Sequence, residues 1–208
     1  MAGMVFDVAL LTDETRARLC EAVRSAYSSA AIEPHAKHPF PVGREFARSL
    51  GYPLDLLDSV SPVSVDAFAG VSNLAVLADL PAGARVLDLG CGAGLDSLIA
   101  AQRVGPGGRV VGLDFSEPML GRAQRAASEA GVSNVDFCRA DAERLPLRDG
   151  SVDVALVNGI FNLNPGRAAI FRELARVVRP DGRVFAAELV LREPLPPAEQ
   201  FSESDWFA

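Results

Sequence analysis

The sequence predicts an α/β protein with a doubly wound, mostly parallel sheet and a helical extension at its N-terminus. Between residues 85 and 191, short apolar runs alternate with helical patterns. This order is typical of a parallel sheet with helices on both faces. A glycine-rich turn at Gly90, Gly92 and Gly94 also follows the first apolar run. Such a turn joins a strand to a helix at the ligand-binding edge of α/β sheets.

Residues 1–70 are expected to form the helical extension, which serves as a lid. Thr12 or Asp13 can cap a helix that runs to about Ser28, because the apolar residues that follow share one helical face. From Glu33 to Pro62 the chain is rich in proline, glycine and aromatic residues. We expect short helices and loops there, covering a cofactor cleft. A further helix over residues 71–80 leads into the core.

Residues 71–193 are expected to form the core, in which strands and helices alternate. The expected strands are 85–89, 109–113, 135–139, 152–158 and 183–191, and the expected helices are 95–104, 117–130 and 166–178. Ser116 is positioned to cap the second of these helices, and Gly131 to end it. Residues 194–208 read as a loop and the start of a helix. The sheet is thus expected to be truncated after its fifth strand, which leaves that strand at an edge.

The composition favours a cytoplasmic protein that binds small molecules. The net charge is −7 and Lys37 is the only lysine, so no basic block offers a track for nucleic-acid phosphates. The longest apolar runs, such as Val152–Val157, are too short to cross a membrane. The high alanine and glycine content fits a bacterial source. The cysteines are few and widely spaced and form no C-x-x-C pair, so no metal site is expected.

The glycine-rich turn has the spacing G-x-G-x-G, with Asp88 two residues ahead of it. Dinucleotide-binding proteins have G-x-G-x-x-G instead, and that pattern would need glycine at Leu95 or Ser97. Glycine lets the backbone approach a ligand closely, and the helix start beyond it offers free N–H groups. The turn therefore predicts a nucleotide-like cofactor other than NAD.

Four motifs in order resemble those of class I S-adenosylmethionine (SAM) methyltransferases. The first is Val86–Gly94, and the second is Asp114 at the end of the second strand. The third surrounds Asp141, and the fourth is Arg176–Arg183, after Asn158 has closed the fourth strand. The resemblance implies SAM as the cofactor. It also implies that Asp114 binds the ribose hydroxyls and that Asp141 binds the adenine amine.

Within that family the chain resembles the arsenite methyltransferase-like, methyltransferase-domain (type 11/25) group. The stretch from Asn158 to Pro165 is one of several that carry this similarity. Those enzymes bind trivalent arsenic through cysteine thiolates, one before the first motif and one directly after the asparagine. Here the second position is Gly159, and the first falls in Ala67–Gly70, which has no cysteine. The sequence therefore favours a small organic acceptor over arsenite.

The site prediction follows from these motifs and from the few chemically active side chains near them. The candidate cofactor-binding residues are Asp88, Gly90, Cys91, Gly92, Gly94, Asp96, Asp114, Phe115, Asp141, Ala142 and Asn158. The candidate catalytic residues are Asn158, Tyr27 and His38.

We therefore expect a SAM-dependent methyltransferase that acts on a small molecule by in-line displacement. No nucleic acid or membrane is expected as a partner, and a homodimer is left open. One alternative is an arsenite methyltransferase. A second, of another class, is a SAM-binding protein without catalytic activity.

Overall fold

The computed structural model describes residues 12–190. Its centre is a parallel sheet with the strand order β3-β2-β1-β4-β5. The strands are β1 (Arg85–Leu89), β2 (Arg109–Asp114), β3 (Val135–Arg139), β4 (Val152–Asn158) and β5 (Val178–Ala187). The predicted C-terminal segment, 194–208, lies outside the described residues.

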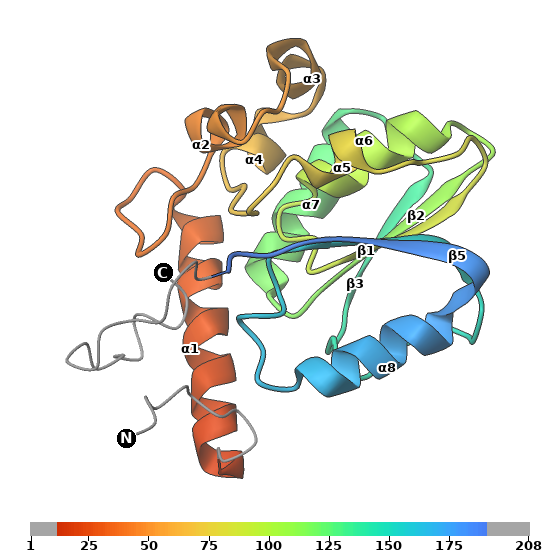
Figure 1. The fold of residues 1–208 in the computed structure, drawn as a ribbon. Helices are drawn as coiled ribbons and strands as arrows, with labels where there is room; N and C mark the ends of the chain where they lie inside the picture. The colour runs from red at the N-terminus through yellow and green to blue at the C-terminus, as the bar shows by residue number, and fades with distance from the viewer. Residues whose placement is uncertain (1–11, 191–208) are drawn as a thin grey trace.

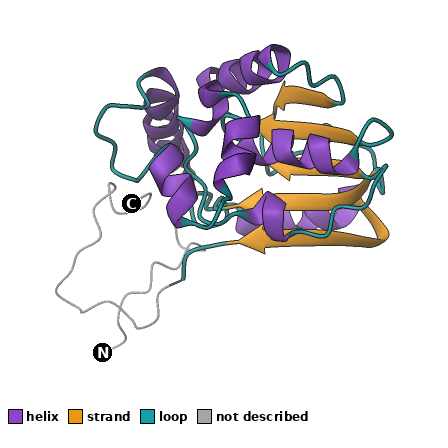
Figure 2. Ribbon diagram, turned by 90° about the horizontal axis from the view of Figure 1, so that it is seen from above, coloured by secondary structure: helices purple, strands orange, loops and turns teal. Residues whose placement is uncertain are grey.

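Helices cover both faces of this sheet. The helices α6 (Leu95–Val104) and α7 (Glu117–Glu129) lie on one face, and α8 (Arg167–Val177) lies on the other (Figures 1 and 2). The crossover from β1 through α6 extends the sheet in one direction, whereas β4 and α8 extend it in the other. The predicted doubly wound α/β fold is confirmed.

The core elements begin and end close to where the sequence predicts them, except for β5. Ser116 caps α7, since its Oγ accepts a hydrogen bond from the backbone N–H of Met119 at 3.4 Å. β5 was expected to begin at residue 183 but begins at Val178, directly after α8. Asp181 therefore lies within this strand. Asp181 has φ +66°, and the pairing with β4 changes register at that level.

The N-terminal residues form α1 (Asp13–Ile32) and four short helices, α2 (Arg44–Ser49), α3 (Leu54–Ser59), α4 (Pro62–Val65) and α5 (Leu74–Leu77). Thr12 caps α1 as expected, but the helix runs four residues further than predicted because its end is held to α7. The guanidinium of Arg122 donates to the carbonyl of Ala31.

α5 is much shorter than the expected helix over 71–80. Arg103 binds the carbonyls of Ala75 and Val76, which a longer helix would use itself.

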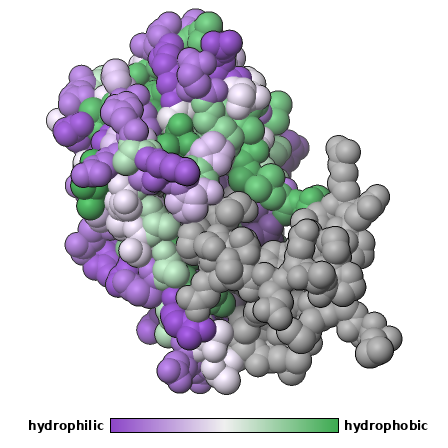
Figure 3. Space-filling view, turned by 90° about the vertical axis from the view of Figure 1, so that its left-hand side faces the viewer, coloured by the Kyte–Doolittle hydropathy of each residue, from purple (hydrophilic) through white to green (hydrophobic). Residues whose placement is uncertain are grey.

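The N-terminal residues share a hydrophobic core with the sheet. Tyr52, Leu57 and Phe68 are buried in the same cluster as Leu98 of α6 and Val86 of β1. On the face turned to the left in Figure 1, a strip of hydrophobic residues runs beside hydrophilic ones at the top and on the left of the view (Figure 3). Among residues 12–190, no helix combines the length and the apolar character that a membrane crossing requires.

The carboxylate of Asp153, at the start of β4, accepts hydrogen bonds from both neighbouring strands, β1 and β5. Asp153 accepts hydrogen bonds from the backbone N–H of Arg85 at 2.7 Å, from the Arg85 guanidinium at 3.0 and 3.1 Å, and from Arg179 at 2.7 Å. These contacts, chiefly those of the Arg85 guanidinium, lower the pKa of Asp153 from 3.8 to about 2. The ionised carboxylate therefore stabilises the folded state.

Asp153→Asn is expected to lower the free energy of unfolding by about 2 kcal/mol at pH 7, since one pKa unit corresponds to about 1.4 kcal/mol. The folded-state pKa lies below the unfolded one. The stabilisation is therefore complete above about pH 4 and is lost as the pH falls through about 2. Denaturant unfolding at pH 7 and near pH 2 checks this. An equal difference between variant and wild type at both pH values would contradict it.

Candidate functional site

The glycine-rich loop after β1 adopts the backbone conformation that its residues predict. Gly90, Gly92 and Gly94 have φ values of +77°, +52° and +86°, which residues with a Cβ rarely adopt. Gly94 is the N-cap of α6, so the loop delivers the chain into the first turn of that helix. The N–H groups of the three glycines donate within the protein, to the carbonyls of Leu113 and Cys91 and to the carboxylate of Asp114, so what these glycines offer a ligand is close approach of the backbone.

A cavity of about 610 Å³ opens at this edge of the sheet, a size typical of small-molecule sites. Its walls include the glycine loop, the ends of β1, β2 and β4, and one face of α1. β1 and β4 are neighbours whose following helices pack on opposite faces of the sheet. This is the switch point at which open α/β sheets bind ligands.

Two buried carboxylates lie near the carboxyl ends of neighbouring strands and border this cavity. Asp88 of β1 is 1% exposed and accepts a hydrogen bond from Ser97 Oγ at 2.5 Å. Asp114 of β2 accepts from the backbone N–H groups of Gly92 and Ser116 at 2.9 and 2.8 Å. Burial raises the pKa of both carboxyls, and the nearby Asp96 raises that of Asp88 further. Between described residues, no ion pair neutralises either acid, so the cavity favours a ligand that carries positive charge.

Asp96 and Asn158 also border the cavity, but they bind each other and the segment before α5. Asn158 Nδ2 donates to Asp96 Oδ2 and to the carbonyl of Ser72, both at 2.8 Å. Its Oδ1 accepts from the N–H groups of Val71 and Ser72 at 2.9 and 3.1 Å. The hydroxyl of Tyr52 donates to Asp96 Oδ1 at 2.5 Å. The Asn158 amide thus makes all four hydrogen bonds open to it within the protein.

Exchanging these two residues tests their pairing. Asp96→Asn and Asn158→Asp are each expected to lower the free energy of unfolding by about 1–3 kcal/mol. Asp96→Asn sets two amides opposite each other in a buried site, and Asn158→Asp sets two carboxylates opposite each other. The double variant puts a donor opposite an acceptor again and should recover about half of the summed loss. Denaturant unfolding of the four proteins measures this. Strictly additive losses would contradict the pairing.

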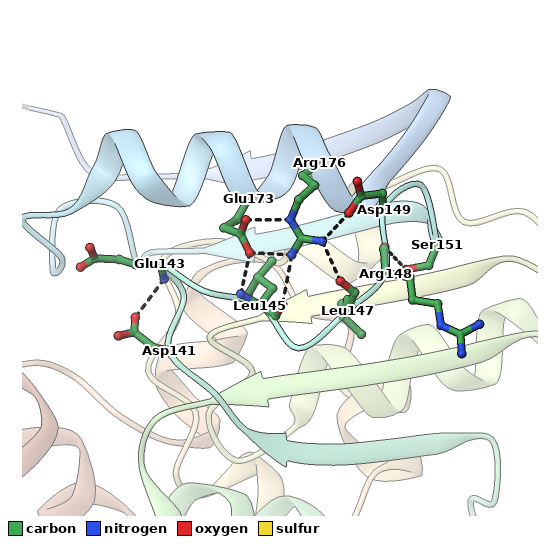
Figure 4. Close-up of polar contacts among 9 residues, drawn as sticks. All are labelled: Asp141, Glu143, Leu145, Leu147, Arg148, Asp149, Ser151, Glu173 and Arg176. Atoms are coloured by element: carbon green, nitrogen blue, oxygen red, sulfur yellow. Dashed lines mark hydrogen bonds and ion pairs between the residues drawn. The ribbon is translucent and has the colours of Figure 1, made fainter.

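Asp141 and Ala142 also line the cavity, in the segment between β3 and β4. Arg176 of α8 holds this segment in place (Figure 4). Its guanidinium donates to the carbonyls of Leu145 and Leu147 at 3.0 and 2.7 Å, and it forms an ion pair with Asp149 at 2.7 Å. The first motif and the Asp141 segment, about fifty residues apart in sequence, therefore meet at one cavity.

The remaining candidates differ in position. Cys91, Phe115 and Tyr27 line the cavity, and Tyr27 stacks on Phe40 with ring centroids 4.3 Å apart. The structure does not bring His38 to the cavity, because its Nε2 lies 2.9 Å from the carbonyl oxygen of Glu33 in a loop outside it.

The cover of the cavity also differs from the prediction. Its walls include α1 and residues 64–70 but none of the residues from 33 to 62. Three residues of the cavity wall were not among the predicted site residues: Cys20 and Val23 of α1, and Glu143 beside Asp141. No motif marks these residues. The one available signal was the helical spacing that puts Cys20, Val23 and Tyr27 on neighbouring turns of α1.

Comparisons with known proteins agree on one family. A family model described as "Methyltransferase domain" matches residues 80–206. The chain belongs to the class I SAM-dependent methyltransferases. An arsenite methyltransferase of Halobacterium salinarum is 38% identical over 147 residues, which cover 71% of this chain and 37% of that protein. A demethylmenaquinone methyltransferase of Lactococcus lactis is 38% identical over 106 residues, covering 51% and 42%.

A solved structure extends the comparison to the fold. The arsenic(III) SAM methyltransferase of Chlamydomonas reinhardtii superposes with a TM-score of 0.57 at 30% identity, covering 72% of this chain and 50% of that one. The chain thus spans half or less of the length of these relatives. The family, its fold and its cofactor, SAM, are those that the sequence predicts.

The residues at the cavity fit this cofactor. SAM carries a sulfonium and an ammonium group, and the buried carboxyls of Asp88 and Asp114 lie beside a glycine loop without side chains. A positive charge next to them would offset the burial that raises their pKa values. Adding a Cβ to Gly90 would bring it within 2.3 Å of Ile160 Cγ2. The loop therefore keeps its close packing only with glycine at this position.

Proposed function

We propose that this chain transfers the methyl group of SAM to a small organic acceptor. The observation that carries the proposal is that Asp88, the glycine loop, Asp114 and Asp141 border a single cavity of about 610 Å³. When bound, SAM supplies a methyl group already activated by the sulfonium. The chain's own residues then bind the cofactor, orient the acceptor in line with the methyl group and exclude water.

We assign the cofactor to the side of the cavity formed by Asp88, the glycine loop, Asp114 and Asp141. Asp96 and Asn158 act by positioning, since their polar atoms hold the segment that continues from Ala67–Gly70 of the cavity wall. Tyr27 faces the acceptor from α1. Burial raises its pKa, with further contributions from Glu188 and Asp114, so at neutral pH it offers a hydrogen-bonding hydroxyl rather than a base.

The cysteines support an organic acceptor over arsenite. Trivalent arsenic needs thiolates. Burial and neighbouring acids raise the pKa values of Cys20 and Cys91, the two cysteines that line the cavity. Both therefore remain thiols. Cys138 is exposed on β3 and is not part of the cavity wall. A cytoplasmic location, a bacterial source and a homodimer stay predictions of the sequence.

A turnover assay tests the proposal. The chain is incubated with SAM carrying a labelled methyl group and with small phenols, amines and acids, or with As(III) and a thiol reductant. Labelled product and S-adenosylhomocysteine (SAH) are expected with an organic acceptor. Activity with As(III) that is lost in Cys138→Ser would favour the arsenite alternative. SAM binding without turnover on any acceptor would favour a SAM-binding protein without catalytic activity.

A further inference from the structure

The part of the cavity not assigned to the cofactor has an apolar wall. Val23 and Tyr27 of α1 face it from one side, and Phe68 and Ile160 border it from elsewhere in the chain. Cys20 lies one helical turn from Val23 and Arg24 on α1. Such a wall favours an acceptor with an apolar body about the size of an aromatic ring.

The cations on the cavity wall are already paired. Arg24 forms an ion pair with Glu21 on the same helix, and Arg139 forms one with Glu117 at 2.6 Å. These are the arginines that border the cavity among residues 12–190, and no lysine of that range borders it. The wall therefore offers no free cation for an acidic acceptor.

The acids on the same wall are not neutralised. Asp141 and Glu143 both border the cavity, and no ion pair between described residues includes either. The position of Glu143 is fixed by two contacts. Its backbone N–H donates to Asp141 Oδ1 at 2.9 Å, and its carboxylate packs where a Cβ on Gly166 would lie, 2.1 Å from Cδ.

The effect of these acids reaches α1. After burial, the largest contributions that raise the pKa of Cys20 come from Glu143 and Asp141, and Arg16 of α1 makes a smaller contribution that lowers it. The negative charge is therefore felt on the wall that faces the acceptor. An anion placed there would lose its hydration and meet like charge, whereas an amine or a neutral molecule would not.

We propose that the acceptor is a small molecule with an apolar, ring-sized body and no negative charge, and that Glu143 is the residue that disfavours acidic acceptors. The proposal rests on the proposed function, because it concerns the acceptor's part of the same cavity, which Glu143 borders next to the residues assigned to the cofactor. It narrows the acceptor class from phenols, amines and acids to neutral and cationic molecules.

Three matched probes test the proposal in calorimetric titrations at pH 7.5. They are 2-phenylethylamine, 2-phenylethanol and phenylacetate, which differ chiefly in charge, and each is titrated into the chain saturated with SAH. The amine and the alcohol are expected to bind, and phenylacetate is expected to bind at least tenfold more weakly than the amine. Glu143→Gln should narrow that ratio at least threefold. Glu45→Gln, on α2 outside the cavity and paired with Arg48, should leave it unchanged.

Each other outcome overturns the proposal in a recognisable way. If phenylacetate bound as tightly as the amine, the cavity would not select against negative charge. If Glu143→Gln left the ratio of the two affinities unchanged, Glu143 would not be the residue that disfavours acidic acceptors. SAH binding without binding of any probe would rule out the ring-sized acceptor and leave the proposed function standing. A folded chain that does not bind SAH would overturn the proposed function and this inference together.

Discussion

Asp114→Ala is expected to weaken SAM binding about 10- to 100-fold. The carboxylate is buried at the end of β2 and accepts from the N–H of Gly92 in the glycine loop. Its removal deletes the proposed acceptor of the ribose hydroxyls and also a contact that holds the loop. Hydrogen bonds to a charged group contribute about 1.5–3 kcal/mol each, and 1.4 kcal/mol is a tenfold change in affinity. Calorimetric titration with SAM measures the change.

The matched control is Asp136→Ala. Asp136 is an exposed aspartate on β3 that pairs with Arg109 at 2.6 Å, away from the cavity. This variant should bind SAM as the wild type does, because exposed ion pairs contribute little. If folded Asp114→Ala also kept its SAM affinity within twofold, the assignment of the ribose contact to Asp114 would be wrong.

Gly94→Ala is expected to lower the free energy of unfolding by about 2–4 kcal/mol and to abolish SAM binding. Gly94 has φ +86°, and a Cβ there would lie 2.9 Å from Ala123 Cβ and 3.3 Å from Ala123 Cα. The left-handed conformation costs about 1–2 kcal/mol for a residue with a Cβ, and overpacking adds about 1–3 kcal/mol. Relief requires a shift of α6 against α7, which would displace the loop. Denaturant unfolding and SAM titration measure the two effects.

Gly121→Ala provides the comparison on the neighbouring helix. Gly121 lies within α7, and a Cβ there would meet no heavy atom within 4 Å. Alanine is the better helix former by about 0.5–1 kcal/mol, so this variant should be slightly more stable and should bind SAM normally. If Gly94→Ala and Gly121→Ala had similar effects, the backbone conformation and crowding at Gly94 would not determine the conformation of the glycine loop.

The features that the sequence predicted well are local in the chain. Strand, turn and helix follow one another between Arg85 and Val104, so apolar runs and glycine spacing are enough to place them. Asp88 lies next to the last residue of β1 and Asp114 is the last residue of β2, and the parallel order of these neighbouring strands brings both to the same edge. The cofactor half of the site could therefore be predicted before the structure.

The features that the sequence analysis missed depend on contacts between distant segments. Tyr52 reaches Asp96 across 44 positions, and Arg176 holds the segment at Leu145 across 31. Nothing in the sequence around Tyr52 or Arg176 indicates a partner so far away in the chain. The acceptor wall on α1 was missed for the same reason, since only packing against α7 turns Cys20 and Val23 toward the cavity. The short length of α5 was missed for the same reason, because Arg103 of α6 donates to the carbonyls of Ala75 and Val76 that a longer helix would use.

Calorimetric titration of this chain with SAM and with SAH tests the central claim most directly. The account predicts saturable binding of both at one site, with the SAM affinity weakened about 10- to 100-fold in Asp114→Ala and kept in Asp136→Ala. A folded chain that binds neither molecule would contradict the assignment of the cavity at the ends of β1 and β2 as the cofactor site.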